Sequence, residues 1–279
     1  MAVDTSIRSV NQHASSTAGA PVLTGVLRGQ RRSLALWSLA LAAVSTIYIG
    51  FWPLMGEDTM QQAIAGMPED MIVAMGYDRI GTPAGYMTST VYGLLGPILL
   101  LVFTIANGAR LIAGDEENGT LELELTSPVA RRRVFAERLL ALWLDALLLV
   151  AVVALVSVIL VNALDMDVAF TGILAGATGL YLLVAGMGTV ALAIGAITGR
   201  RAIALGVAAA LAVAAFIFDA IGPVADADWM TAISPFSWYL ENEPLATGFD
   251  VRGLLLLAII PVVFGTAGLF GFDRRDLMV

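Results

Sequence analysis

Six long apolar stretches dominate the pattern of hydrophobic and polar positions along the 279-residue chain. A helix needs about 20 apolar residues to cross the ~30 Å hydrocarbon core of a bilayer, and each stretch is that long. Runs such as LLLVAVVALVSVILV do not alternate as the strands of a membrane β-barrel do. We therefore predict an all-α, polytopic membrane protein, a bundle of six transmembrane helices. The predicted spans cover residues 33–55, 89–113, 135–162, 168–198, 202–222 and 250–272.

The composition supports a membrane protein and removes two kinds of chemistry. Hydrophobic residues make up 58% of the chain and charged residues 14%, and the mean hydropathy is +0.85, whereas soluble domains carry far more charge. The chain contains no cysteine, which excludes disulfides and thiolate metal sites. All 15 basic residues are arginine, and a Walker-type phosphate-binding loop needs a lysine. We therefore expect no such ATP site in this chain.

The arginines gather on one side of the predicted spans. If the N-terminus lies inside the cell, only Arg79 and Arg252 fall outside it. The positive-inside rule then places the N-terminus and the C-terminus in the cytoplasm, at the plasma (inner) membrane. The first span starts too late and is too long for a cleaved signal peptide, so we expect it to be retained. The inner arginines are Arg8, Arg28, Arg31, Arg32, Arg110, Arg131, Arg132, Arg133, Arg138, Arg200, Arg201, Arg274 and Arg275.

The chain divides into a tail, a junction and a membrane domain. Residues 1–20 are small and polar, and we expect a disordered cytoplasmic tail. Residues 21–32 mix apolar and basic positions, which fits an amphipathic helix in the membrane interface or, equally, a positive flank of the first span. Residues 33–279 form the six-helix transmembrane domain. We expect short helices in the long outer loops over 56–88 and 223–249.

Few charges fall inside the predicted spans, and they are candidates for function. Asp145 lies in the third span, where an unpaired carboxylate costs on the order of 2–3 kcal/mol. Arg138 lies two turns earlier on the same helix face, and Arg110 approaches from the second span. We favour a structural pair or a latch at an inner gate over a proton relay, because no second buried acid or histidine lies nearby.

The fourth span is rich in glycine at helical spacing, with Gly172, Gly176, Gly179 and Gly186 as candidate packing residues. Small residues let helices approach closely in a membrane. This face either packs inside the bundle or forms a sliding or dimerising surface, and the sequence leaves both open. Prolines in the second and sixth spans, Pro97 and Pro261, should weaken those helices locally.

One charged segment, residues 114–133, interrupts the apolar pattern and reads GDEENGTLELELTSPVARRR. Leucine and glutamate favour a short helix, which Thr120 can cap and Pro128 ends. Such a helix would offer leucines and carboxylates to a groove on a cytoplasmic partner. The alternative is a solvated charged loop.

This segment, extended as GDEENGTLELELTSPVARRRVFAERLLA, resembles the loop of type-2 ABC exporter permeases. That family shows an acidic pair, then Gly-Thr-Leu-Glu, a leucine-rich turn and Pro-Val-Ser-Arg. The chain departs from it at Ala130, where serine is usual, and at Arg138, where lysine is usual. Ser234-Pro235-Phe236 and the terminal Phe272-Asp273-Arg274-Arg275-Asp276-Leu277 also match, so the resemblance covers nearly the whole chain after residue 25.

The resemblance implies a transmembrane permease subunit of an ATP-driven exporter. Its coupling helix would contact a separate ABC ATPase subunit, which would bind the ATP and Mg while this chain holds no cofactor. A second permease copy, identical or paralogous, would complete the transporter in the lipid membrane, with no nucleic-acid partner. The cargo would be hydrophobic or amphiphilic. The coupling residues implied are Glu117, Gly119, Thr120, Leu121, Glu122 and Leu123.

The main alternative is an ion- or proton-coupled secondary transporter. Such proteins place charged residues or broken helices near the membrane midplane, and this chain offers little there besides Asp145. A membrane-embedded enzyme would need clustered catalytic side chains, and the chain has a single histidine, His13, in its tail. We therefore expect no enzymatic site.

Overall fold

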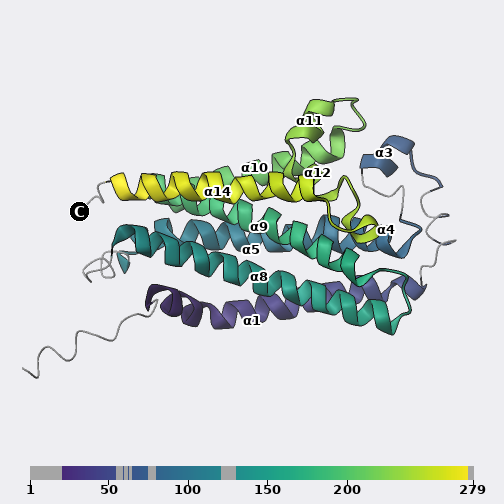
Figure 1. Cartoon of the computed structure of the whole chain (residues 1–279), viewed down its shortest axis with the longest axis horizontal. Helices are drawn as coiled ribbons and strands as arrows, with labels where there is room; N and C mark the ends of the chain where they lie inside the picture. Colours follow the sequence, from purple (N-terminus) through teal and green to yellow (C-terminus); the bar gives the residue numbers. More distant parts are fainter. Residues whose placement is uncertain are drawn as a thin grey trace, which may run out of the picture.

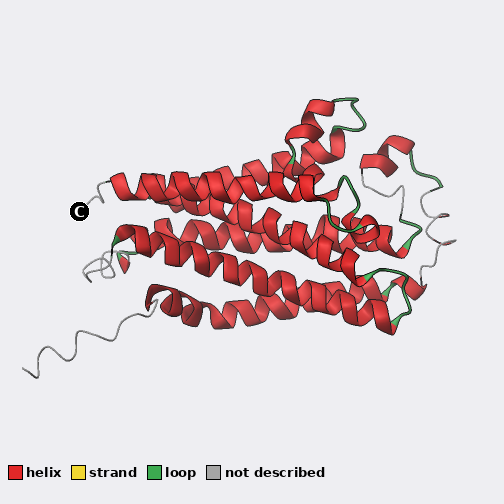
Figure 2. Ribbon diagram, viewed as in Figure 1, coloured by secondary structure: helices red, strands yellow, loops and turns green. Residues whose placement is uncertain are grey.

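The computed structural model describes residues 21–54, 59, 62, 65–74, 80–120 and 130–275, and within these ranges the chain forms helices and no strand (Figure 2). Six helices of the described part are long and apolar enough to cross a membrane, which confirms the predicted six-helix bundle. They run side by side (Figure 1). They are α1 (Pro21–Gly50), a composite span over Pro83–Glu117, α8 (Arg131–Ala163), α9 (Phe170–Thr198), α10 (Arg201–Ile221) and α14 (Val251–Arg274).

The composite second span is the least regular of the six. It begins as α4 (Pro83–Met87) and passes through a π-helical segment, η1 (Thr88–Leu95), into α5 (Gly96–Ala109). A second π-helical segment, η2 (Arg110–Gly114), then leads into the short α6 (Asp115–Glu117). π-Helical segments are rare and often mark functional sites.

The local sequence accounts for the first π-helical segment. Thr88, Ser89 and Thr90 each donate a side-chain hydroxyl to the carbonyl four residues earlier, at 2.6 to 2.9 Å. Pro97 follows at the start of α5 and has no N–H to continue the helical bonds. A Cβ at Gly96 would lie 2.4 Å from a carbonyl oxygen of the preceding turn, so this position needs glycine. The change of helix type therefore falls beside Pro97.

α9 is the central helix of the bundle and contacts α5, α8, α10 and α14. Small residues allow this central position, because they let neighbouring backbones approach closely. A Cβ at Gly108 of α5 would lie 2.3 Å from the carbonyl oxygen of Gly188 in α9. A Cβ at Gly268 of α14 would lie 2.8 Å from the Cα of Ala193. α9 is thus held between α5 and α14 by backbone-close contacts.

The four predicted packing glycines of α9 face other parts of the same chain. A Cβ at Gly172 would lie 2.2 Å from the carbonyl oxygen of Leu245, and one at Gly176 would lie 2.5 Å from the Leu245 side chain. Gly179 faces the ring of Tyr239 in the same way, and Gly186 faces α14. Of the two alternatives for this glycine face, packing inside the bundle is the one observed.

Short helices gather at the end of the bundle opposite the C-terminal end of α14 (Figure 1). The segment between the first and second spans contributes α3 (Glu69–Ala74). The segment between α10 and α14 contributes α11 (Asp228–Ile233), α12 (Pro235–Leu240) and α13 (Pro244–Thr247). α12 and α13 pack against α9, so this end is covered by protein.

Two side chains fix the starts of α12 and α14. Ser234 accepts hydrogen bonds from the N–H groups of Phe236 and Ser237 and donates to the carbonyl of Ala215, so the Ser-Pro-Phe motif caps α12 and ties it to α10. Asp250 caps α14 by accepting from the first N–H groups of that helix. The amide of Asn242 also donates to Asp250 and holds the pKa of its carboxyl below the usual range.

α1 continues through residues 21–32 without a break, so the basic junction and the first span are one helix. Val22 and Gln30 are buried, whereas Arg28, Arg31 and Arg32 are exposed. This first part is therefore amphipathic and packs on the bundle. α1 lies mainly against α8.

We predict that replacing Gly172 with alanine destabilises the bundle by about 1–3 kcal/mol, because the added Cβ has no room against the Leu245 backbone. Thermal unfolding of the purified protein in detergent measures the effect. Gly206→Ala is the matched control: nothing lies within 4 Å of its Cβ, and alanine favours the helix by up to about 1 kcal/mol. Equal melting temperatures for the two variants would contradict this account of α9 packing.

Candidate functional site

Three consecutive carboxylates, Asp115, Glu116 and Glu117, end the second span as α6. We call them the acidic triplet. Asp115 accepts a hydrogen bond from Arg138 of α8 at 2.7 Å and forms an ion pair with it. The Arg138 side chain is 1% exposed and that of Asp115 is 24% exposed, so a partly buried ion pair joins the ends of the second and third spans.

Glu116 joins the second span to the end of the sixth. Its carboxylate pairs with Arg275, which follows α14 directly. The same guanidinium donates to the carbonyl of Ala196 in the last turn of α9, at 3.0 Å. A cation suits this position, because the carbonyls at a helix C-terminus carry partial negative charge. Arg131 of α8 in turn donates to the Arg275 carbonyl at 2.8 Å, so four spans meet at this arginine.

Glu117 joins the second span to the fifth. Its Oε1 accepts a hydrogen bond of 2.8 Å from the backbone N–H of Arg201, the first residue of α10. A carboxylate is favourable at a helix N-terminus because unpaired N–H groups give that end a partial positive charge. Glu117 is exposed, so water competes for this contact.

The basic run at the start of α8 forms a second set of contacts. Arg132 pairs with Asp273 of α14 at 2.7 Å. Arg133 pairs with Glu137 at 2.7 Å, and Glu137 also accepts from the N–H groups of Val22 and Leu23 at 3.0 Å each. Glu137 of α8 therefore caps the first turn of α1. Exposed pairs such as Arg132–Asp273 contribute only about 0–1 kcal/mol each.

Deeper in the bundle, four polar side chains from three spans form a group that we call the Asp145 cluster: the buried Gln30, Asn107 and Asp145 and the half-buried Arg110. Asn107 donates to Asp145 Oδ2 at 3.1 Å, and Arg110 donates to Asn107 Oδ1 at 3.1 Å. The Gln30 amide, oriented to match its neighbours, donates to Asn107 Oδ1 and Asp145 Oδ2 at 3.1 Å each and accepts from Arg110 at 3.0 Å. The cluster thus holds one negative and one positive charge.

The cluster changes the expected pairing of the intramembrane charges. Arg110 and Asp145 do come together, through the two amides of Gln30 and Asn107. Arg138 instead turns toward the membrane boundary and pairs with Asp115. Arg138 and Asp145 lie two turns apart on α8. Arg138 pairs with the carboxylate of Asp115, and Asp145 accepts from the amide of Asn107.

Sequence reasoning missed Gln30 and Asn107. Each is an uncharged polar residue that is 6% exposed. The available signal was an amide inside or beside an apolar run, as in FTIANGARL, since a buried amide in a membrane helix needs a partner. The partner itself lies on another span and leaves no mark in the local sequence.

The structure covers half of the residues predicted for ATPase contact. Glu117 is the last residue of α6, and Gly119 and Thr120 follow it at the end of the bundle, where Gly119 has a φ of +71° and turns the chain. The Thr120 hydroxyl donates to the Asp115 carbonyl at 3.0 Å. Leu121, Glu122 and Leu123 lie outside the described residues.

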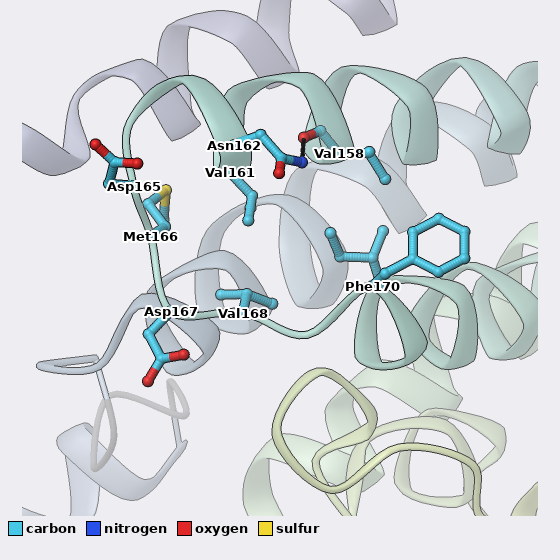
Figure 3. Close-up of a pocket in the computed structure, with 9 residues that line it drawn as sticks. Val158, Val161, Asn162, Asp165, Met166, Asp167, Val168 and Phe170 are labelled. Carbon is cyan, nitrogen blue, oxygen red and sulfur yellow. Dashed lines mark hydrogen bonds between the residues drawn. The ribbon is translucent and has the colours of Figure 1, made fainter.

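A hollow of about 380 Å³ lies at the other end of the bundle, where α8 turns into α9 (Figure 3). Asp165 and Asp167 line it, but their carboxylates point in different directions, while Asn162 donates to the Val158 carbonyl. No group of three or more metal-ligating side chains occurs in the described part of the chain. The arrangement therefore supplies no metal centre there.

A second, apolar groove of about 470 Å³ lies between α5 and α10. Its lining comprises aliphatic side chains of both helices and the rings of Phe216 and Phe236. It offers a surface for an apolar chain and holds no charged side chain.

Comparison with known proteins agrees with a bundle of membrane-spanning helices. A family model described as ABC-2 family transporter protein matches residues 27–277. Comparison with curated proteins gives no match. Because the family match spans almost the whole chain, the protein belongs to the ABC-2 family of transporter proteins, as a multi-pass membrane subunit of the permease type.

Proposed function

We propose that this chain is the transmembrane subunit of an ATP-driven exporter, coupled to a separate ABC ATPase subunit through residues 114–133. The ATPase would bind ATP and Mg, and two permease subunits, identical or paralogous, would form the translocation path. The observation that carries the proposal is the acidic triplet. Its three carboxylates connect the base of this loop to α8, α10 and α14. A push on the loop would therefore reach several spans at once.

The distribution of charge supports a cytoplasmic position for the loop. The described arginines at the inner end include Arg131, Arg132 and Arg133 beside the loop and Arg274 and Arg275 at the end of α14. The short helices α3, α11, α12 and α13 lie at the opposite end. The positive-inside rule then places both termini and the loop in the cytoplasm.

The apolar groove between α5 and α10 supports a hydrophobic or amphiphilic cargo. It is lined by aliphatic and aromatic side chains. A molecule dissolved in the bilayer could enter it without losing its apolar surroundings. Charged cargo would find no partner among the lining residues.

The Asp145 cluster is the one observation that bears on an ion- or proton-coupled secondary transporter. Its carboxylate is already balanced by Arg110 through the amides of Gln30 and Asn107. One carboxylate, one guanidinium and two amides that bond to one another are typical of a structural connection between helices. Membership of the ABC-2 family also favours an ATP-driven transporter.

We predict that Leu121→Asp abolishes co-purification of the ABC ATPase subunit, because a carboxylate in an apolar docking groove costs several kcal/mol when it is buried without a partner. The two subunits are co-expressed, and the complex is isolated in detergent through a tag on the permease. Asp226→Asn is the matched control, since Asp226 is exposed at the opposite end and asparagine tolerates its φ of +50°. Retention of the ATPase by Leu121→Asp would argue against docking through this loop.

We predict that a cysteine at position 120 is shielded from an impermeant maleimide in intact cells, whereas one at position 226 is labelled. Thr120 lies at the arginine-rich end and Asp226 at the other, and both are exposed. The chain has no cysteine of its own, so each signal is specific. Thr120→Cys should react once the membrane is permeabilised. Labelling of Thr120→Cys in intact cells would reverse the orientation.

A further inference from the structure

α1 is joined to α8 and to the end of the second span at two depths. At its first turn, the N–H groups of Val22 and Leu23 bond to Glu137 of α8. Two turns further on, Gln30 enters the Asp145 cluster and bonds to side chains of α5 and α8. Two separate attachments prevent α1 from both sliding and tilting relative to α8.

These attachments differ in burial from the contacts that the acidic triplet makes with α10 and α14. Within the Asp145 cluster, Gln30 and Asn107 are 6% exposed and Asp145 is 1% exposed, while Arg110 is half-buried. By contrast, Glu117 is exposed where it bonds to α10, and Glu116 and Arg275 are each 18% exposed where α6 meets the end of α14. Water can replace an exposed partner during a movement, but it cannot replace a buried one.

We propose that α1, η2 and α8 move as one rigid lever and that Asp145 is the positioning residue that holds the lever together. The exposed contact from Glu117 to α10 and the half-buried contact from Glu116 to Arg275 are then the ones that open when the loop is pushed. This inference rests on the proposed function, because the ATPase supplies the push. In this proposal α1 moves together with α8, although α1 does not flank the loop over residues 114–133.

The composition of the Asp145 cluster fits a tie better than a site for a transported ion. Arg110 already supplies a positive charge to the cluster. The amides of Gln30 and Asn107 hydrogen-bond to each other, to the Asp145 carboxylate and to Arg110. Asp145 Oδ1 is the one carboxylate oxygen in the cluster that accepts no hydrogen bond within the described part of the chain. The tie therefore depends on Oδ2 and its two amide donors.

Distances between spin labels in the reconstituted complex test the lever directly. The absence of native cysteine allows labels at Gly29 of α1, Leu140 of α8 and Gly206 of α10, all exposed positions. On addition of ATP and vanadate, the Gly29–Leu140 distance should stay constant while the Leu140–Gly206 distance changes. If both distances change together, the lever is overturned while the proposed function stands. If the ATPase does not bind or neither distance responds to nucleotide, the proposed function fails and the lever with it.

Exchange of two cluster residues tests the role of Asp145. Asp145→Asn and Asn107→Asp should each lower ATP hydrolysis by the complex about tenfold, with co-purification of the ATPase retained. The double variant Asp145→Asn/Asn107→Asp keeps one carboxylate and one amide facing each other, and it should recover activity to within about threefold of the parent protein. Glu117→Gln serves as a control on the exposed side and should leave the Gly29–Leu140 distance unchanged.

The outcomes separate positioning from simple folding. If a single variant does not fold, as judged by its melting temperature, the double variant still tests whether Asp145 positions the lever. Its ATP hydrolysis and its spin-label distances are the readouts. A broadened Gly29–Leu140 distribution in Asp145→Asn, restored in the double variant, supports the lever. Single variants with parental hydrolysis and a sharp Gly29–Leu140 distance, or a folded double variant with no recovery, would overturn it.

Discussion

Carboxylates that end an apolar helix must find partners, and this requirement organises the end of the bundle at which the second and third spans are joined. Asp115, Glu116 and Glu117 leave the second span together, yet each binds a different helix. The Arg138 side chain, which pairs with Asp115, is buried at this end of the bundle. Because the three partners come from α8, α10 and the end of α14, the loop that follows is mounted on much of the bundle and not on its two flanking spans alone.

The middle of the bundle relies on a different interaction, the close contact of small residues around α9. Lipid gives no hydrophobic drive for helices to associate, so packing has to supply the attraction. Glycines at 108, 188 and 268 bring the backbones of α5, α9 and α14 together, and Gly172 admits the Leu245 backbone from α13. The closely packed centre and the charged end of the bundle complement each other, because a displacement at the charged end meets a core that cannot simply compress.

The contacts of α1 with α8 and the contact of the second span with α10 differ in how far water can reach them. The Asp145 cluster and the Glu137 cap fasten α1 to α8, whereas Glu117 meets α10 in reach of water. The second span joins both kinds of contact and carries two π-helical segments, one at each end of α5. A helix with this irregular bonding places Arg110 and the acidic triplet at the register that their partners need.

The sequence by itself determined the six spans, the side on which arginine accumulates and the position of the charged loop, because hydropathy and charge are local properties of the chain. It also marked Arg110, Arg138 and Asp145 as charges that require partners. Only the tertiary structure decided that Arg138 pairs with Asp115, that Gln30 and Asn107 mediate between Arg110 and Asp145, and that the glycines of α9 pack internally. The physical reason is distance along the chain: Glu116 and Arg275 are 159 residues apart, and no local pattern records which of several arginines reaches which carboxylate.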